Sequence, residues 1–257
     1  MNPVRLRIAL FADQVGLDTA SPILGDHLAA VVSSSPLVPT DHVPQDATFL
    51  LQERDSELGH EALLQRLSEL NLDALVCFSY SLKIPQALIS LPRLDAVNIH
   101  GALLPECRGA SVLNWVLVED HSETGCTMHH LSDVIDNGDI AFRDTIPITD
   151  DDDALTLRSK IAIAAQLQLQ KALAVWLQGD RLPRARQDSS LARRYRRRTP
   201  DDGLFDWSYS DRQIFNLVRA LVKPWPGARF VSNGRLHVID RRLTLEEVAE
   251  LRQIHGS

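Results

Sequence analysis

Short apolar runs alternate with amphipathic stretches over roughly the first half of the chain. Apolar runs lie at 6–12 (LRIALFA), 28–34 (LAAVVSS), 72–80 (LDALVCFSY) and 95–100 (DAVNIH). Between the second and third runs, 60–70 (HEALLQRLSEL) carries leucines at the spacing of a helix. Strand-like runs that alternate with helical stretches predict βαβ units and a mostly parallel sheet.

The pattern continues with a predicted helix at 111–120, strands at 125–131 and 140–148, and a long helix over 151–180. In the long helix, apolar side chains recur at steps of three or four residues. The acidic run 150–153 comes at its start, where negative charge favours the helix dipole. A structural role is therefore sufficient to explain that run.

Three regions follow from these patterns. We expect an N-terminal domain at 1–180, a linker at 181–202 and a short C-terminal subdomain at 203–257. The linker is polar and basic, and its stretch 192–198 (ARRYRRR) is either a solvated segment or a phosphate contact. The fold class is α/β: a Rossmann-like, mostly parallel sheet with a small C-terminal helix-plus-hairpin subdomain.

Local signals define the C-terminal subdomain. Ser210 and Gln213 form a capping-box pattern before an amphipathic helix, and Thr244 with Glu247 repeats the pattern near the end of the chain. Between them, "ARFVSNGRLHVID" predicts a hairpin around Asn233-Gly234. Such a hairpin leaves an edge strand open, so we expect this subdomain to mediate a homodimer.

Composition narrows the class of protein. The 257 residues are 44% apolar and 24% charged, as in ordinary globular proteins. A formal net charge of -7 disfavours general nucleic-acid binding. No apolar run is long enough to predict a membrane span, and the start does not resemble a signal peptide.

Cysteine usage points to the cytoplasm. Cys77, Cys107 and Cys126 are odd in number and form no CxxC pair, which argues against a disulfide framework and a zinc knuckle. No cluster of His, Cys and carboxylates has metal-ligand spacing, so we expect no metal.

Candidate chemistry lies at the end of the fourth apolar run. Asn98 and His100 are two apart on a strand and point the same way, at the end where open α/β sheets bind ligands. Asn can donate to an oxyanion, and His can donate or accept a proton. A carboxylate would complete the set, and residue type alone leaves Asp133, Asp136 and Asp139 open.

The order of these pieces resembles the N10-formyltetrahydrofolate-dependent formyltransferases. The likeness covers roughly residues 50–235 and is carried by "DALVCFSYSLKIP", by "NIHGALLPECRGASVLNWVLVEDHSETGCTMHHLSDVIDNGDI" and by "RRRTPDDGLFDWSYSDRQIFNLVRALVKPWPGARF". The resemblance implies a catalytic trio of Asn98, a protonated His100 and Asp136. Asn98 and His100 would stabilise an oxyanion, while Asp136 would hold the imidazole and relay the proton.

The same resemblance implies two binding sites. The formyl donor is expected at Phe78, Ser79, Tyr80, Ser81, Leu82, Leu104, Val134, Ile135 and Asp139. The acceptor is expected at Cys107, Arg108, Gly109 and Trp115. Two motifs depart from the family: Cys107 stands where an aromatic residue is usual, and "FADQVGLD" replaces the G-T-P-x-F turn of methionyl-tRNA members. The mechanism needs no covalent enzyme intermediate, so Cys107 is not expected to be a nucleophile.

The acceptor is expected to be a nucleotide-linked amino sugar. "LNWVLVEDHSETGCTMH" most resembles the branch that includes the formyltransferase half of the enzyme modifying UDP-4-amino-4-deoxyarabinose. Few residues follow Pro200, which leaves little room for the complete barrel of members acting on tRNA. The alternatives are methionyl-tRNA formylation, formylation of a hydroxylamine in siderophore assembly, hydrolysis of formyltetrahydrofolate, or non-catalytic folate or nucleotide binding.

Overall fold

The computed structural model describes residues 4–52 and 57–256. Its centre is a seven-stranded sheet in the order β3-β2-β1-β4-β5-β7-β8. The first five of these strands are parallel to one another. Strand β7 runs antiparallel to both of its neighbours, β5 and β8. The strands of this sheet are β1 (Ile8–Ala12), β2 (Leu28–Ser33), β3 (Thr48–Leu51), β4 (Ala74–Phe78), β5 (Asp95–His100), β7 (Glu123–His130) and β8 (Ile140–Pro147).

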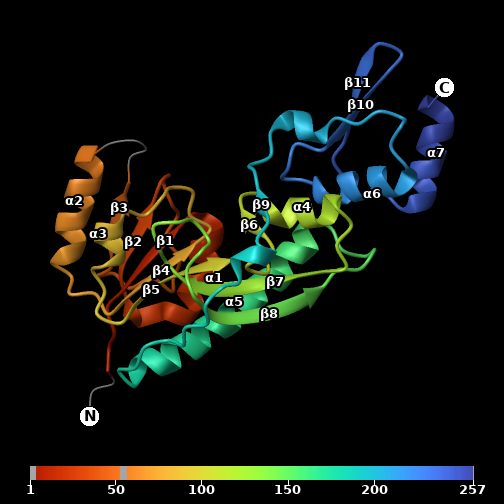
Figure 1. Ribbon diagram of the computed structural model, residues 1–257. Helices are drawn as coiled ribbons and strands as arrows, with labels where there is room; N and C mark the ends of the chain where they lie inside the picture. The colour runs from red at the N-terminus through yellow and green to blue at the C-terminus, as the bar shows by residue number, and fades with distance from the viewer. Residues whose placement is uncertain (1–3, 53–56, 257) are drawn as a thin grey trace.

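Helices cover both faces of the sheet (Figure 1). Alternate residues of β1 face opposite ways: Ile8 and Leu10 join a core with α1 and α5, whereas Ala9 and Phe11 join a second core with α2 and α3. The parallel strands are therefore apolar on both sides, as their sequences predicted. The helices of this part are α1 (Gln14–Leu24), α2 (Glu57–Ser68), α3 (Gln86–Ile89), α4 (Val112–Val118) and α5 (Ala154–Leu177).

The predicted fold class is confirmed, but the sequence pattern did not reveal several elements, among them α1, β3 and α3. Helix α1 begins at the N-cap Asp13, whose side chain accepts a hydrogen bond from the Gly16 amide, and it contains Pro22. The short edge strand β3 and the one-turn helix α3 were also missed. The predicted strands and the helices at 60–70, 111–120 and 151–180 are all present with boundaries shifted by a few residues.

The C-terminal part packs as a helix, a hairpin and a last helix. These are α6 (Asp211–Ala220), β10 (Ala228–Ser232), β11 (Arg235–Ile239) and α7 (Leu245–His255). Both predicted capping boxes are formed, and the hairpin turns at Asn233-Gly234, where both residues have positive φ. Figure 1 shows the hairpin projecting away from the seven-stranded sheet.

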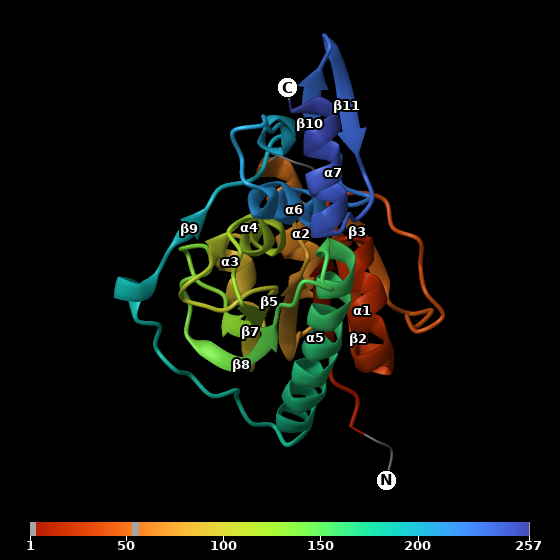
Figure 2. The ribbon, with the colours of Figure 1, turned by 90° about the vertical axis from the view of Figure 1, so that its right-hand side faces the viewer.

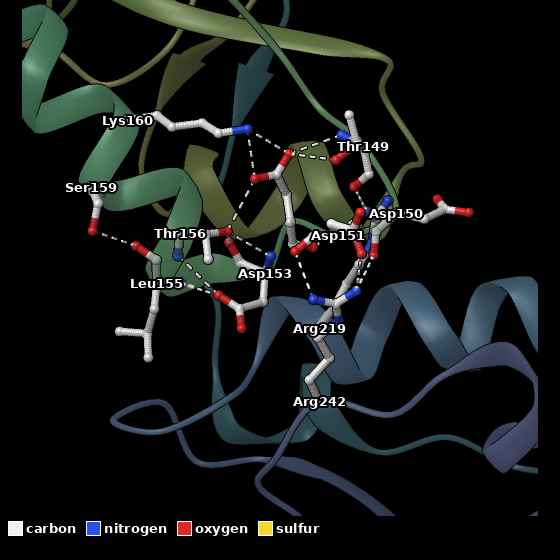
Figure 3. A network of polar contacts seen from close by, with 11 residues as sticks. Thr149, Asp150, Asp151, Asp153, Leu155, Thr156, Ser159, Lys160, Arg219 and Arg242 are labelled. Atoms are coloured by element: carbon white, nitrogen blue, oxygen red, sulfur yellow. Dashed lines mark hydrogen bonds and ion pairs between the residues drawn. The ribbon is translucent and has the colours of Figure 1, made fainter.

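A polar network fastens this C-terminal part to the start of α5 (Figure 3). The Arg219 side chain on α6 is only 1% exposed and donates to the Thr149 carbonyl at 2.8 Å. Arg242 pairs with Asp151 at 2.9 Å and also donates to the Asp150 and Asp151 carbonyls. The acidic run therefore anchors the C-terminal part as well as starting a helix.

The intervening segment runs along the outside of the seven-stranded sheet (Figure 2). Figure 2 shows it leaving the far end of α5, passing β8 and returning to the C-terminal part. Ala185 exchanges two backbone hydrogen bonds with Ile140, at 2.8 and 2.9 Å. Further along, β9 (Arg194–Tyr195) pairs in parallel with β6 (Arg108–Gly109). The segment is thus attached to the domain at two places.

Candidate active site

A cleft of about 660 Å³ opens at the carboxyl ends of β1, β4 and β5. The chain order of the strands reverses between β1 and β4, and open α/β sheets bind ligands at such a switch point. The cleft wall includes the ends of these strands, the loop after β7, one face of α5 and part of the linker. All three residues of the predicted trio, Asn98, His100 and Asp136, lie in this wall.

Asn98 contacts a histidine that the sequence analysis did not select. Strands β5 and β7 pair antiparallel with Asn98 opposite His129, so their side chains lie on one face of the sheet. Asn98 Nδ2 lies 3.0 Å from His129 Nε2, and His129 Nδ1 donates to the His130 carbonyl at 3.0 Å. Because the Asn98 amide nitrogen can only donate, this contact uses one of the two amide hydrogens of Asn98.

His100 is held as a neutral imidazole. Its Nε2 donates to the Cys107 carbonyl at 2.6 Å, which leaves Nδ1 facing Asp136 Oδ1 at 3.7 Å. Burial lowers the pKa of His100, although the Asp136 carboxylate acts in the opposite direction. A lowered pKa favours the neutral ring with an unprotonated Nδ1, whereas the resemblance implied a protonated His100.

Asp136 is an ionised carboxylate between two imidazole rings. It is 7% exposed, its backbone has a φ of 59°, and its Oδ2 accepts from the Gly109 amide at 2.8 Å. Burial raises the pKa of Asp136, but the His129 and His100 rings and the Gly109 amide outweigh burial and lower it to about 2. Oδ1 lies 3.7 Å from both His100 Nδ1 and His129 Nε2. Of the three aspartates left open by residue type, Asp136 is the one beside His100.

Gly109 is the one predicted acceptor residue that lines the cleft. Its φ is 103°, and a Cβ atom here would lie 2.1 Å from the Tyr195 carbonyl oxygen. A side chain at this position would separate β6 from β9. The glycine thus brings the linker close to the amide that holds Asp136.

The other predicted acceptor residues do not reach the cleft wall. Cys107 is buried, and burial raises the pKa of its thiol to about 11, so it is no thiolate nucleophile. Arg108 is 7% exposed and turns its guanidinium to Gln187. Trp115 donates to the Arg196 carbonyl at 2.8 Å and stacks on Tyr195.

The predicted formyl-donor residues mostly line the cleft. Phe78, Ser79, Tyr80, Ser81 and Leu82 form one wall, and Val134 and Ile135 form another. The last two are 51% and 50% exposed, and half-exposed apolar side chains inside a cleft suit a flat ring. The residues present therefore fit a reduced pteridine.

Two predicted donor residues lie elsewhere. Leu104 is fully buried in the domain, and Asp139 is absent from the lining of the cleft and has its carboxylate 3.9 Å from Arg184. In this structure neither side chain lines the cleft, so neither is placed to contact a ligand there.

Three arginines in the cleft wall were missed. Arg158 comes from α5, and Arg194 and Arg197 come from the linker. The basic run 192–198 was the sequence signal for the linker pair, whereas Arg158 lies in an ordinary helical pattern. Its position in the cleft depends on how α5 packs.

Two classes of feature are absent from the part of the chain that the structure describes. Among residues 4–52 and 57–256, no helix is long and apolar enough to cross a membrane. Within the same ranges, no group of three or more His, Cys, Asp or Glu side chains is arranged to hold a metal ion.

Solved structures with this fold include several formyltransferases. A 4-N formyltransferase from Francisella tularensis is 15% identical with a TM-score of 0.72, and the match covers 93% of this chain and 98% of that one. An N-formyltransferase from Helicobacter canadensis, in complex with folinic acid and dTDP-3-aminofucose, is 15% identical with a TM-score of 0.68, covering 90% and 85%.

A longer protein shares the same fold. HypX from Aquifex aeolicus, in complex with tetrahydrofolic acid, is 16% identical with a TM-score of 0.67. The match covers 91% of this chain, which spans only 37% of the HypX chain.

Family models match both parts of the sequence. The model described as formyl transferase matches residues 27–173, and the model described as formyl transferase, C-terminal domain, matches residues 197–252. The first alone covers more than half of the chain and contains Asn98, His100 and Asp136. The chain belongs to the formyl transferase family.

Proposed function

We propose that this protein transfers a formyl group from N10-formyltetrahydrofolate to the amino group of a nucleotide-linked amino sugar. The observation that carries the proposal is the convergence of Asn98, His100 and Asp136 in a cleft that Val134 and Ile135 also line. The donor, when bound, supplies an activated formyl carbon.

Each polar group then has a distinct task. The second amide hydrogen of Asn98 stabilises negative charge on the formyl oxygen. The amine nitrogen bonds to the formyl carbon, and His100 Nδ1 accepts the proton that the amine loses, while the Asp136 carboxylate stabilises the resulting imidazolium. As the bond between the formyl carbon and N10 breaks, the imidazolium returns this proton to N10, so that tetrahydrofolate leaves as a neutral amine. Through its contact with the Asn98 amide, His129 orients that amide toward the cleft.

The charge of the cleft supports an anionic acceptor. Arg158, Arg194 and Arg197 line it, and guanidinium groups match the oxygens of a diphosphate. The Helicobacter neighbour with dTDP-3-aminofucose supports the same class. Methionyl-tRNA is the weaker candidate, because the formal net charge of -7 opposes binding to a polyanion.

A comparison of acceptor classes, each assayed separately, tests the proposal. The protein is incubated with N10-formyltetrahydrofolate and, separately, a panel of dTDP- and UDP-linked amino sugars, methionyl-tRNA, a hydroxylamine, or no amine. We expect N-formyl product, detected by mass spectrometry, with a sugar nucleotide. Formylation of tRNA alone, or folate hydrolysis that needs no amine, would overturn the acceptor assignment.

We further propose that the protein forms a homodimer through its C-terminal subdomain. In this proposal the chain has three parts, residues 1–180, 181–202 and 203–257, and the protein works in the cytoplasm. One face of the β10–β11 hairpin exposes Val231, Leu236 and Val238 at 57%, 57% and 53%. Apolar faces of this kind favour pairing. Three free, buried cysteines agree with a reducing compartment.

Sedimentation velocity at micromolar concentration tests the dimer. We expect a dimer for the wild type and a monomer for Val231→Asp, because a buried charge without a partner opposes association. Val38→Asp changes an equally apolar side chain that is 72% exposed in the N-terminal domain, serves as the matched surface control and should remain dimeric. A monomeric wild type would contradict the proposal.

A further inference from the structure

Gln187 lies in the linker but behaves like a core residue. It is 7% exposed, and its Oε1 accepts from Arg108 Nη2 at 2.7 Å and from Arg108 Nε at 3.2 Å. Its Nε2 donates to the carbonyls of Asp136 at 3.0 Å and Gly138 at 2.7 Å. Both amide hydrogens and both acceptor positions of Gln187 are thus occupied.

These bonds hold the backbone from which the Asp136 carboxylate projects. Asp136 has the left-handed φ of 59°, and a non-glycine residue stays in that region when its neighbours fix it. Gln187 binds the carbonyls on either side of Asn137, so it fixes two peptide groups of the loop at once. The loop also lies against the end of β7: a Cβ atom at Gly138 would lie 1.8 Å from the His130 carbonyl oxygen, and the His130 amide donates to the Asp139 carbonyl at 2.8 Å.

The same network reaches the second support of the carboxylate. The Gly109 amide donates to Asp136 Oδ2, and Gly109 follows Arg108 in the chain. Arg108 and Gln187 therefore join the loop that supplies this amide to the loop that supplies the carboxylate. Asp136 in turn faces His100 from β5, His129 from β7 and the Cys77 thiol from β4.

We propose that Gln187, together with Arg108, is a positioning residue that sets the place of the Asp136 carboxylate between His100 and His129. The inference rests on the proposed function for its kinetic consequence, but not for its geometry. It assigns part of the linker to the catalytic machinery. It also gives Arg108 a supporting role for the Asp136 loop, through Gln187, in place of the predicted contact with the acceptor.

A matched pair of buried glutamines tests the proposal. Gln187→Leu removes the network, whereas Gln168→Leu removes an equally buried amide on α5 that binds the Cys126 carbonyl and Asp144 instead. We expect both variants to lose thermal stability. Only Gln187→Leu should lower kcat, at least roughly tenfold, with the KM for N10-formyltetrahydrofolate changed less than about threefold.

Conservative variants separate positioning from space filling. Gln187→Glu keeps an acceptor for Arg108, but its carboxylate can donate to neither the Asp136 nor the Gly138 carbonyl. We therefore expect it to lower kcat as much as Gln187→Leu does. Arg108→Lys keeps the charge without the two-pronged contact and should lower kcat severalfold while leaving KM values near wild type. Wild-type kcat in either variant, or equal losses in Gln187→Leu and Gln168→Leu, would overturn the inference.

A titration of Asp136 by carboxyl-carbon NMR needs no turnover. The wild-type carboxylate is expected to titrate at a pKa of about 2, and in Gln187→Leu it should move up toward the usual 3.8. No such shift is expected in Gln168→Leu. If the pKa of Asp136 is unchanged in folded Gln187→Leu, the positioning role is contradicted. If this pKa rises in the variant as expected but the wild type transfers no formyl group, only the proposed function is contradicted.

Discussion

His100 is the residue whose protonation decides the chemistry. Its Nε2 is committed to the Cys107 carbonyl, so proton exchange with a substrate is left to Nδ1, beside the Asp136 carboxylate. A neutral ring can accept a proton from the amine, whereas a charged ring cannot. In the proposed mechanism the active form is therefore the deprotonated form, and burial favours it.

We predict that the pKa of His100, followed by histidine NMR, lies below its usual 6.5. The unfolded chain binds a proton between the folded pKa and 6.5, whereas the folded chain does not. His100 therefore makes stability rise with pH across that window and adds no pH dependence above it. Signals are assigned with His100→Gln, and a titration above 6.5 would contradict the account.

Residue type and strand spacing were enough to select Asn98 and His100. Asp136 was chosen over Asp133 and Asp139 only through the resemblance to the formyltransferases, because the three are equal candidates by residue type. His129 was missed because its contact with Asn98 requires the antiparallel pairing of β5 and β7.

The contact of Arg108 could not be predicted for a related reason. Arg108 was expected to contact the acceptor, but its guanidinium binds Gln187, which is 79 residues away along the chain. Local patterns carry no information on such pairs, because tertiary packing creates them.

At the scale of elements, the apolar runs predicted most strands of the central sheet, whereas helix α1 was not predicted. Gly16 and Pro22 within α1 weaken its helical pattern, and its stability comes from packing against α5 and β1. Helix α5 was predicted from residue 151 and begins at Ala154, and the acidic run there has more specific contacts than a helix dipole requires.

We predict that Asp153→Ala lowers the free energy of unfolding by about 0.5–2 kcal/mol, because Asp153 caps the amides of Leu155 and Thr156. Asp151→Ala is the control in the same run. Asp151 is 95% exposed and makes only a surface ion pair, so its loss should cost about 0–1 kcal/mol. Equal losses in urea unfolding would favour the dipole explanation over the cap.

At the scale of the molecule, the C-terminal part is held by a buried arginine. Arg219 donates to Asn216 on its own helix and to the Thr149 carbonyl near α5. Burial lowers the pKa of this guanidinium, and its hydrogen bonds compensate for desolvation. Removing it leaves buried acceptors without partners.

Arg219→Met should therefore lower the free energy of unfolding by about 1–3 kcal/mol, since unsatisfied buried polar groups are costly. Arg212→Met, which breaks pairs of an arginine side chain that is 37% exposed, should cost about 0–1 kcal/mol. Urea denaturation measures both. A larger loss for Arg212→Met would show that the surface pairs, not the buried group, fasten the two parts.

The most direct test of the account is the kcat/KM for formyl transfer from N10-formyltetrahydrofolate to a sugar nucleotide by Asn98→Ala. Loss of one oxyanion donor typically lowers the rate about a hundred- to a thousandfold. We predict a loss of at least roughly a hundredfold in a variant that keeps the fold, judged by its circular dichroism and melting temperature. Near wild-type transfer by folded Asn98→Ala would contradict the assignment of this cleft as the formyl-transfer site.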